Sequence, residues 1–204
     1  MTKNSYGGLF IAFDGPNGVG KSTVIEHVES ELVARNIAVF LTKEPTDTEL
    51  GLFTRRIAET LDGESLTCLV AADRYHHLKQ EVVPHLLKGE VVLSDRYVLS
   101  SLILQCMDGV NADFVLAVNE RAICPDIQVA ISADRDVVRS RLATRGQLTR
   151  FERGQRTGEE LVFLQRGKNA LARLGIEVLD IENSGNLQRN VSCIVERILE
   201  AAKE

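Results

Sequence analysis

The sequence lacks any segment that would place the chain in a membrane. No apolar run approaches the roughly 18 residues of a membrane-spanning helix. The opening residues, MTKNSYGG, also lack the apolar centre of a secretory signal. We therefore expect a cytoplasmic protein without a membrane partner.

Cysteine pairs and excess basic charge are missing as well. The four cysteines contain no C-x-x-C pair, which argues against a zinc site and a disulfide framework. A net charge of −5 offers no basic face to a nucleic-acid polymer. No internal repeat or Pro/Ser-rich linker interrupts the 204 residues, and 44% hydrophobic content is ordinary for a folded protein. We expect one domain spanning residues 1–204.

Short runs rich in Val, Ile and Leu alternate with longer helical patterns. The runs predict strands at residues 8–13, 37–42, 90–94, 127–131 and 176–180. The helical patterns cover residues 21–35, 50–60, 66–88, 98–107, 112–121, 134–144, 158–174 and 187–203. This alternation predicts an α/β fold, with a parallel sheet of about five strands flanked by helices.

The run GPNGVGKST at residues 15–23 carries the strongest functional signal. Gly15, Gly20, Lys21 and Ser22 fit G-x-x-x-x-G-K-[ST] between a predicted strand and a predicted helix. In such a P-loop, backbone N–H groups and an exposed lysine bind phosphates, and the hydroxyl binds Mg²⁺. The alternative is a turn that only joins strand to helix. The predicted ATP-binding residues are Gly15, Asn17, Gly18, Val19, Gly20, Lys21, Ser22 and Thr23.

Phosphoryl transfer needs a carboxylate that supports the metal and cations beyond the P-loop. Asp95 ends the apolar run before it, where a central strand would deliver it beside the P-loop. We predict that Asp95 and Ser22 hold Mg²⁺ and that Arg96 points into the same site. Capping of the next helix is the alternative for Asp95.

Three further residues follow predicted strands. Asp14 lies just before the P-loop and would influence Mg²⁺ through water or contact the acceptor, or else hold the strand-to-loop turn. Lys43 and Glu44 leave the second strand at the edge where open α/β sheets bind ligands, although a simple turn is the alternative.

Arg74 shares one helical stripe with Val70 and His77. It is a candidate base or phosphate contact, whereas charged residues on such stripes are usually solvated or paired. No metal-ligand spacing supports His76 or His77, which we expect at the surface or packed.

The polar stretch at about 144–157 predicts a flexible lid. Its arginines could close over the transferring phosphoryl group, or could belong to a solvated helix end. They are Arg145, Arg150, Arg153 and Arg156. Arg141, in the helix before them, could lie against the adenine ring.

The segments FDGPNGVGKST, KEPT, AADRYHHL, SDRYVLSSLILQ, PDIQVAIS and RGQLTRFE resemble thymidylate kinases in order and spacing. The resemblance implies the P-loop fold of nucleoside monophosphate kinases, ATP with Mg²⁺ as donor, dTMP as acceptor, and a homodimer. Gly18 stands where one subtype carries Arg, so the chain is similar to the bacterial subtype. There the lid supplies the catalytic cation, which implies this role for Arg145 and Arg150.

The same resemblance implies roles at the acceptor. Asp95 becomes the metal-linked catalytic acid, Arg96 the clamp on the acceptor phosphate, and Arg74 a base contact. Ser101 and Gln105 would line the acceptor pocket.

Four positions depart from the family pattern. Val70 stands where the family usually has a Phe that stacks on thymine, and Leu104 replaces a Tyr that crowds the 2′ side of the sugar. Asn17 replaces an acid at the 3′-hydroxyl, and Lys43 replaces an Arg. The acceptor could therefore be dTMP, dUMP or a modified pyrimidine nucleotide.

Two other functions stay open. A nucleoside kinase would need a general base near the sugar, for which Glu44 is the candidate. A non-catalytic P-loop switch is more remote, since the chain has no N-K-x-D signature.

Overall fold

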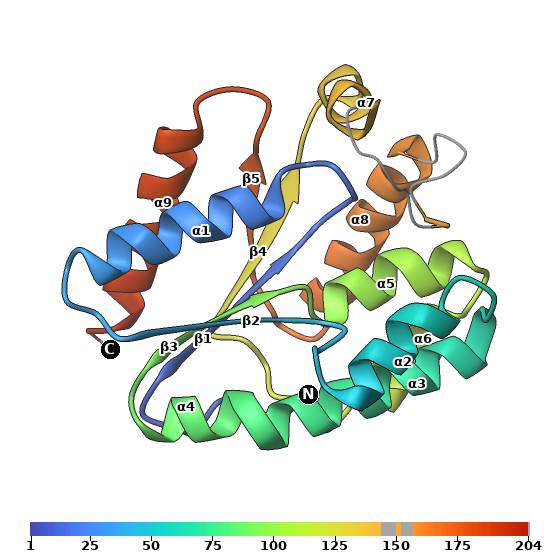
Figure 1. Ribbon diagram of the computed structural model, residues 1–204, viewed down its shortest axis with the longest axis horizontal. Helices are drawn as coiled ribbons and strands as arrows, with labels where there is room; N and C mark the ends of the chain where they lie inside the picture. Colours follow the sequence, from blue (N-terminus) through green and yellow to red (C-terminus); the bar gives the residue numbers. More distant parts are fainter. Residues whose placement is uncertain (144–149, 152–156, 204) are drawn as a thin grey trace.

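The computed structural model describes residues 1–143, 150–151 and 157–203. Its centre is a parallel sheet with the strand order β2-β3-β1-β4-β5 (Figure 1). The strands are β1 (Leu9–Asp14), β2 (Val39–Lys43), β3 (Val91–Asp95), β4 (Ile127–Ser132) and β5 (Val178–Glu182). The predicted α/β fold with five strands is confirmed.

Helices connect and cover these strands. They are α1 (Lys21–Val33), α2 (Glu49–Ile57), α3 (Gly63–His77), α4 (Val83–Leu87), α5 (Val98–Met107), α6 (Ala112–Val118), α7 (Arg135–Ala143), α8 (Thr157–Ala172) and α9 (Leu187–Ala201). The single helix predicted at 66–88 is α3 and α4 joined by a π-helical turn, η1 (Leu78–Val82). The turn ends just before Pro84, which cannot donate a backbone hydrogen bond within a helix.

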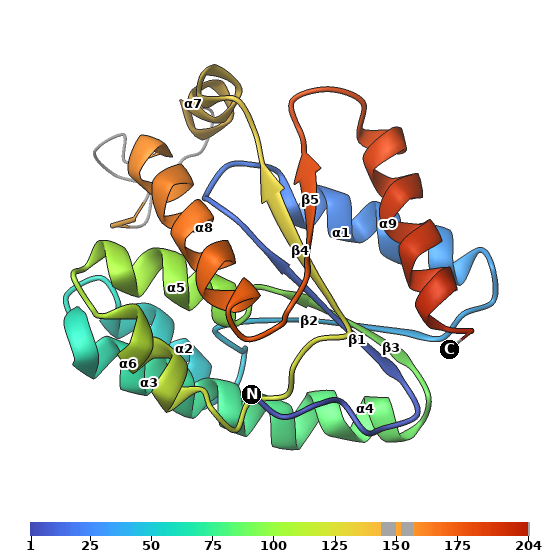
Figure 2. The ribbon, with the colours of Figure 1, turned by 180° about the vertical axis from the view of Figure 1, so that it is seen from behind.

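Both faces of the sheet are buried, as expected for parallel strands joined by helices. Along β1, Ile11 and Phe13 pack with α1 and α9 on one face. Phe10 and Ala12 point to the other face and pack with residues of η1, α4 and the start of α5. Figure 2 shows α8 lying beside α5, where the two helices share a third apolar cluster.

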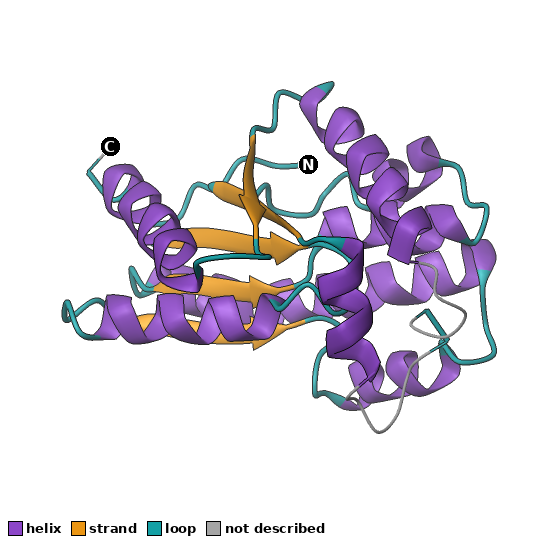
Figure 3. Cartoon of the chain, turned by 90° about the horizontal axis from the view of Figure 1, so that it is seen from above, coloured by secondary structure: helices purple, strands orange, loops and turns teal. Residues whose placement is uncertain are grey.

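The strand register brings the predicted site residues together. Phe13 of β1 and Lys43 of β2 both lie opposite Asp95 of β3. The P-loop, the segment after β2 and Asp95 therefore meet at one edge of the sheet. In Figure 3, helices gather at the end of the sheet to which most strand arrows point. Within the described part of the chain, no helix is both long and apolar enough to cross a membrane.

Candidate active site

The P-loop connects the end of β1 to the start of α1, as the motif predicts. Gly20 precedes the helix with φ of 91°, and a Cβ at Gly15 would lie 2.0 Å from the backbone oxygen of Ile131. Only glycine fits such positions. Among the described residues, no side chain caps the N-terminus of α1. Its backbone N–H groups are therefore available to an anion.

Lys21 is buried rather than exposed, which corrects the expectation from sequence. Its side chain is 6% exposed, and Nζ donates to the backbone oxygens of Gly15 and Pro16 at 3.0 and 2.8 Å. Burial, with a smaller contribution from Arg96, lowers the pKa of Lys21 to about 7. The nearby carboxylates only partly oppose this shift. A bound phosphate would favour the charged form, since opposite charges raise the pKa of an amine.

Ser22 and Asp95 meet as the predicted metal pair. Ser22 Oγ donates to Asp95 Oδ2 at 2.8 Å. Asp95 Oδ1 is buried and, within the described part of the chain, has no hydrogen-bond partner. A hydroxyl and a carboxylate with an unused oxygen fit Mg²⁺, which takes its remaining ligands from phosphate and water. Asp95 does not cap α5, so the alternative suggested for it is wrong.

Asp14 hydrogen-bonds to neighbouring segments of the fold, and its contact with the substrate stays a prediction. Its Oδ1 accepts hydrogen bonds from the backbone N–H groups of Tyr97 and Ser100, at 2.8 and 2.9 Å, and thereby secures the start of α5. Its Oδ2 accepts from Gln128 at 2.9 Å. Burial raises the pKa of Asp14, although these hydrogen bonds oppose the shift. Asp14 does not line the adjacent cavity, so this geometry supports the structural alternative.

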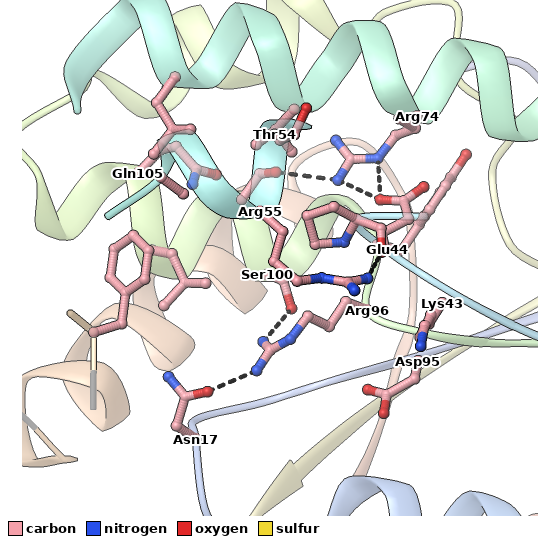
Figure 4. A pocket seen from close by; sticks show the side chains of 18 of the residues that line it. Asn17, Lys43, Glu44, Thr54, Arg55, Arg74, Asp95, Arg96, Ser100 and Gln105 are labelled. Carbon is pink, nitrogen blue, oxygen red and sulfur yellow. Dashed lines mark hydrogen bonds and ion pairs between the residues drawn. The ribbon is translucent and has the colours of Figure 1, made fainter. Parts of the chain in front are cut away.

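A cavity of about 310 Å³ opens beside Asp95. All predicted acceptor residues except Asp14 line it, together with Asn17 and Asp95; they are Lys43, Glu44, Val70, Arg74, Arg96, Ser101, Leu104 and Gln105. Figure 4 shows Asp95 and Gln105 on opposite sides of this cavity. Sequence reasoning missed other lining residues, namely Pro45, Thr54, Arg55, Ala58, Glu59, Leu66, Tyr97, Ser100 and Phe151. Pro45, Tyr97, Ser100 and Phe151 lie within the quoted segments but were assigned no role there, and the remaining residues belong to no motif.

Arg96 links the P-loop to the cavity. Its backbone has φ of 80°, unusual for a residue with a side chain, and its N–H donates to the oxygen of Phe13 at 2.8 Å. Its guanidinium donates to Asn17 Oδ1 at 2.7 Å and to Ser100 Oγ at 3.2 Å (Figure 4). Such backbone strain is often found where a side chain must point into a functional site.

Glu160 of α8 holds the P-loop from the other side, and sequence reasoning missed it. It accepts from the backbone N–H of Asn17 at 2.6 Å and from the Asn17 amide at 3.1 Å. The side-chain oxygen of Asn17 is therefore free to accept the hydrogen bond from Arg96. Burial raises the pKa of Glu160, and the two bonds from Asn17 oppose the shift. No phosphate-binding signature includes a carboxylate so far along the chain.

Glu44 and Arg74 form a buried ion pair beside the cavity. Arg74 Nη2 lies 2.7 Å from Glu44 Oε2, and the other guanidinium contacts are Asn119 and Ser101. His77, fully buried, bonds the second oxygen of Glu44. Burial alone would raise the pKa of Glu44, but Arg74 and His77 together lower it. Glu44 is thus not a simple turn residue, and Arg74 is paired, not solvated.

Gln105 supplies a free acceptor at the far side of the cavity. It is 3% exposed, and its Oε1 has no hydrogen-bond partner within the described ranges. A buried amide oxygen without a partner is costly unless a ligand donates to it. An N–H on the edge of a nucleobase would satisfy it.

Arg150 contacts residues in and beside the lining of the acceptor cavity in this structure. Its guanidinium pairs with both oxygens of Asp108, at 3.1 and 2.6 Å, and donates to the backbone oxygen of Ala58. These partners lie outside the P-loop, so the catalytic role expected for Arg150 stays a prediction. Arg145, Arg153 and Arg156 lie outside the described residues, as does most of the predicted lid.

Arg141 lies on the donor side, beside the P-loop. It donates to the backbone oxygens of Val19 and Asn183, at 2.8 and 3.0 Å. The Asn183 amide also donates to the oxygen of Val19 at 2.8 Å. Arg141 therefore borders the start of α1, while its contact with adenine stays a prediction.

Comparison with known proteins agrees with this geometry. The family model for thymidylate kinase matches residues 13–192. A probable thymidylate kinase of Caldivirga maquilingensis is 37% identical over 167 residues, covering 78% of this chain and 81% of that protein. The thymidylate kinase of Pseudomonas savastanoi pv. phaseolicola is 32% identical, covering 95% of this chain and 97% of that protein. Since the match extends over the P-loop, Asp95 and the cavity residues alike, this chain belongs to the thymidylate kinase family.

Proposed function

We propose that the chain transfers the γ-phosphoryl group of ATP to the phosphate of dTMP. One observation carries the proposal, namely that Arg96 lies between the P-loop and the acceptor cavity. Its side chain is bound to Asn17 on the donor side and to Ser100 on the wall of the cavity. A cation at this position would bind the acceptor phosphate and direct it toward the donor.

The residues of the chain divide the work of the reaction. Mg²⁺-ATP supplies the phosphoryl group and, through the metal, neutralises its developing charge. Ser22 and Asp95 would hold the metal, and Lys21 would neutralise the β and γ oxygens. Gln105 would accept a hydrogen bond from the N–H of the base. The names of the relatives support dTMP as the acceptor.

The buried pair of Glu44 and Arg74 disfavours a nucleoside kinase. Such an enzyme needs a base that accepts a proton from a sugar hydroxyl. Arg74 and His77 hold the pKa of Glu44 below its ordinary value, so this carboxylate is a weak base. A modified pyrimidine nucleotide is the alternative acceptor, because Val70 and Leu104 of the cavity lining are smaller than the aromatic residues usual at these positions.

We also propose that the chain acts as a single P-loop kinase domain in the cytoplasm and forms a homodimer. Helix α2 exposes the apolar side chains of Leu52 and Phe53, at 51% and 42%. Adjacent exposed apolar residues of this kind are common at interfaces between copies of a chain. Sedimentation of the purified protein would measure the oligomeric state.

An acceptor panel tests the proposed activity. The protein is incubated with ATP and Mg²⁺ and with dTMP, dUMP, ribo-TMP or thymidine, and the products are separated chromatographically. We expect dTDP from dTMP and no dTMP from thymidine. Phosphorylation of thymidine alone would identify a nucleoside kinase, and absence of any product would favour a nucleotide switch.

A further inference from the structure

Phe151 belongs to the lining of the acceptor cavity, although the motif that contains it points to the phosphates. The apolar residues Leu66, Val70 and Leu104 also line this cavity. Arg96 and Asp95 line the cavity too, at the phosphate side. An acceptor that places its phosphate at Arg96 would place its base toward the apolar part.

Arg150 fixes the position of its neighbour. The Asp108 side chain is 5% exposed and that of Arg150 is 20% exposed, so this two-pronged ion pair is largely withdrawn from water. Arg150 also binds the backbone oxygen of Ala58, and its backbone N–H donates to Glu59 at 3.2 Å. Ala58 and Glu59 themselves line the cavity. Charge-assisted pairs of this geometry are strong and directional.

Asp108 lies close to the base end of the cavity along the chain. It follows α5 directly, and its N–H donates to the backbone oxygen of Gln105 at 3.0 Å. The guanidinium carbon of Arg150 also lies 4.1 Å from the centre of the Phe151 ring. A cation against one side of the ring further restricts its orientation.

We propose that Phe151 is the aromatic contact for the base of the acceptor, and that Asp108 acts through Arg150 as a positioning residue. The inference rests on the proposed function, because it assumes a pyrimidine nucleotide in the cavity. It also accounts for Val70 and Leu104, since an aromatic ring from another segment can replace rings missing from α3 and α5. A flat base gains most from an aromatic partner, which explains why a ring is useful here.

The test compares two phenylalanines that each lie near an arginine. Phe151→Ala should raise the dissociation constant for dTMP about tenfold, within the range for bases stacked on aromatic side chains. The Michaelis constant for ATP should change less than twofold. Phe163→Ala is the matched control, since Arg166 lies over its ring at 5.1 Å and Phe163 lines a different cavity. It should leave dTMP binding unchanged, as measured by titration calorimetry.

Two further variants test the mechanism of the effect. Asp108→Asn should weaken dTMP binding about threefold, because Arg150 loses its charged partner while the ring remains. Val70→Phe combined with Phe151→Ala should recover at least half of the lost affinity, because it restores an aromatic ring to the lining of the cavity. The gain in affinity from Val70→Phe should be larger in the Phe151→Ala background than in the wild type, whereas equal gains would indicate a purely structural role for Phe151.

The outcomes separate the two proposals. If the wild type binds and phosphorylates dTMP but Phe151→Ala binds it equally well, the assignment of Phe151 is overturned and the proposed function stands. Equal weakening for ATP and dTMP, without recovery by Val70→Phe, would also overturn it. If the wild type neither binds nor phosphorylates any nucleoside monophosphate, the proposed function itself fails.

Discussion

The donor side and the acceptor side of this site are built differently. The donor side is built around one continuous run, residues 15–23, with Asp95 delivered by the neighbouring strand. The acceptor cavity takes residues from the end of β2, from α2, α3 and α5, and from Phe151. A local motif defines its own backbone geometry, whereas a cavity assembled from distant segments depends on how those segments pack.

The largest effect is expected for a substitution of the P-loop lysine on the donor side. Lys21→Met should lower kcat about a thousandfold, because the variant loses the charge that stabilises the transferring oxygens. The Michaelis constant for dTMP should change little, since Lys21 does not line the acceptor cavity. Steady-state kinetics with varied dTMP measures both. Near-normal turnover in the folded variant would refute the P-loop mechanism.

A substitution on the acceptor side should change the Michaelis constant for dTMP, whereas Lys21→Met should change kcat. Arg96→Ala should raise the Michaelis constant for dTMP about 10- to 100-fold, the loss expected for charge-assisted hydrogen bonds to a phosphate. The constant for ATP should stay within about twofold. Arg139→Ala, an exposed arginine of α7, is the control. An unchanged constant for every monophosphate would show that Arg96 does not bind the acceptor phosphate.

The buried state of Lys21 predicts a pH dependence that belongs to the donor side alone. The pKa of Lys21 is about 7 in the folded protein and near its ordinary value of 10.5 when unfolded. Between these values the unfolded chain binds the proton that the folded loop has lost, so the free energy of unfolding rises with pH. From pH 7 to 9 we expect a gain of about 2 kcal/mol relative to Lys21→Met.

Urea unfolding of the nucleotide-free protein and of Lys21→Met at both pH values measures this gain. The comparison removes the contributions of all other titrating groups that the two proteins share. Parallel changes in the two proteins would mean that Lys21 stays charged in the folded loop.

The smallest effect is expected for a substitution in the acceptor cavity that increases its selectivity for the sugar. Leu104→Tyr should increase the preference for dTMP over ribo-TMP about tenfold, because the larger side chain crowds the sugar where the ribonucleotide carries its extra hydroxyl. The ratio of kcat/KM values for the two substrates measures it. A ratio equal to that of the wild type would place sugar discrimination elsewhere in the cavity.

Asp14 and Asp95 show what the sequence alone does not predict, because two similar positions have different roles in the structure. Asp14 and Asp95 each end an apolar strand, and the sequence offers capping of the next helix as the alternative role for Asp95. In the structure Asp14 secures the start of α5, although its own strand leads into the P-loop. Asp95 keeps an oxygen free beside Ser22. These contacts join residues far apart in the sequence, so only the tertiary structure decides which carboxylate meets which helix.

The sequence by itself determined the five strands, the P-loop and the placement of Asp95 and Arg96 at the edge of the sheet. Alternating apolar runs and a glycine-rich loop act through local backbone geometry, which neighbouring residues specify. The tertiary structure decided that Lys21 is buried, that Glu160 holds Asn17, and that Arg150 turns to Asp108. The contacts of Glu160 and Arg150 join segments far apart in the chain, and the burial of Lys21 depends on what packs around its own loop. Their energies depend on desolvation and charge pairing that appear only when the chain is folded.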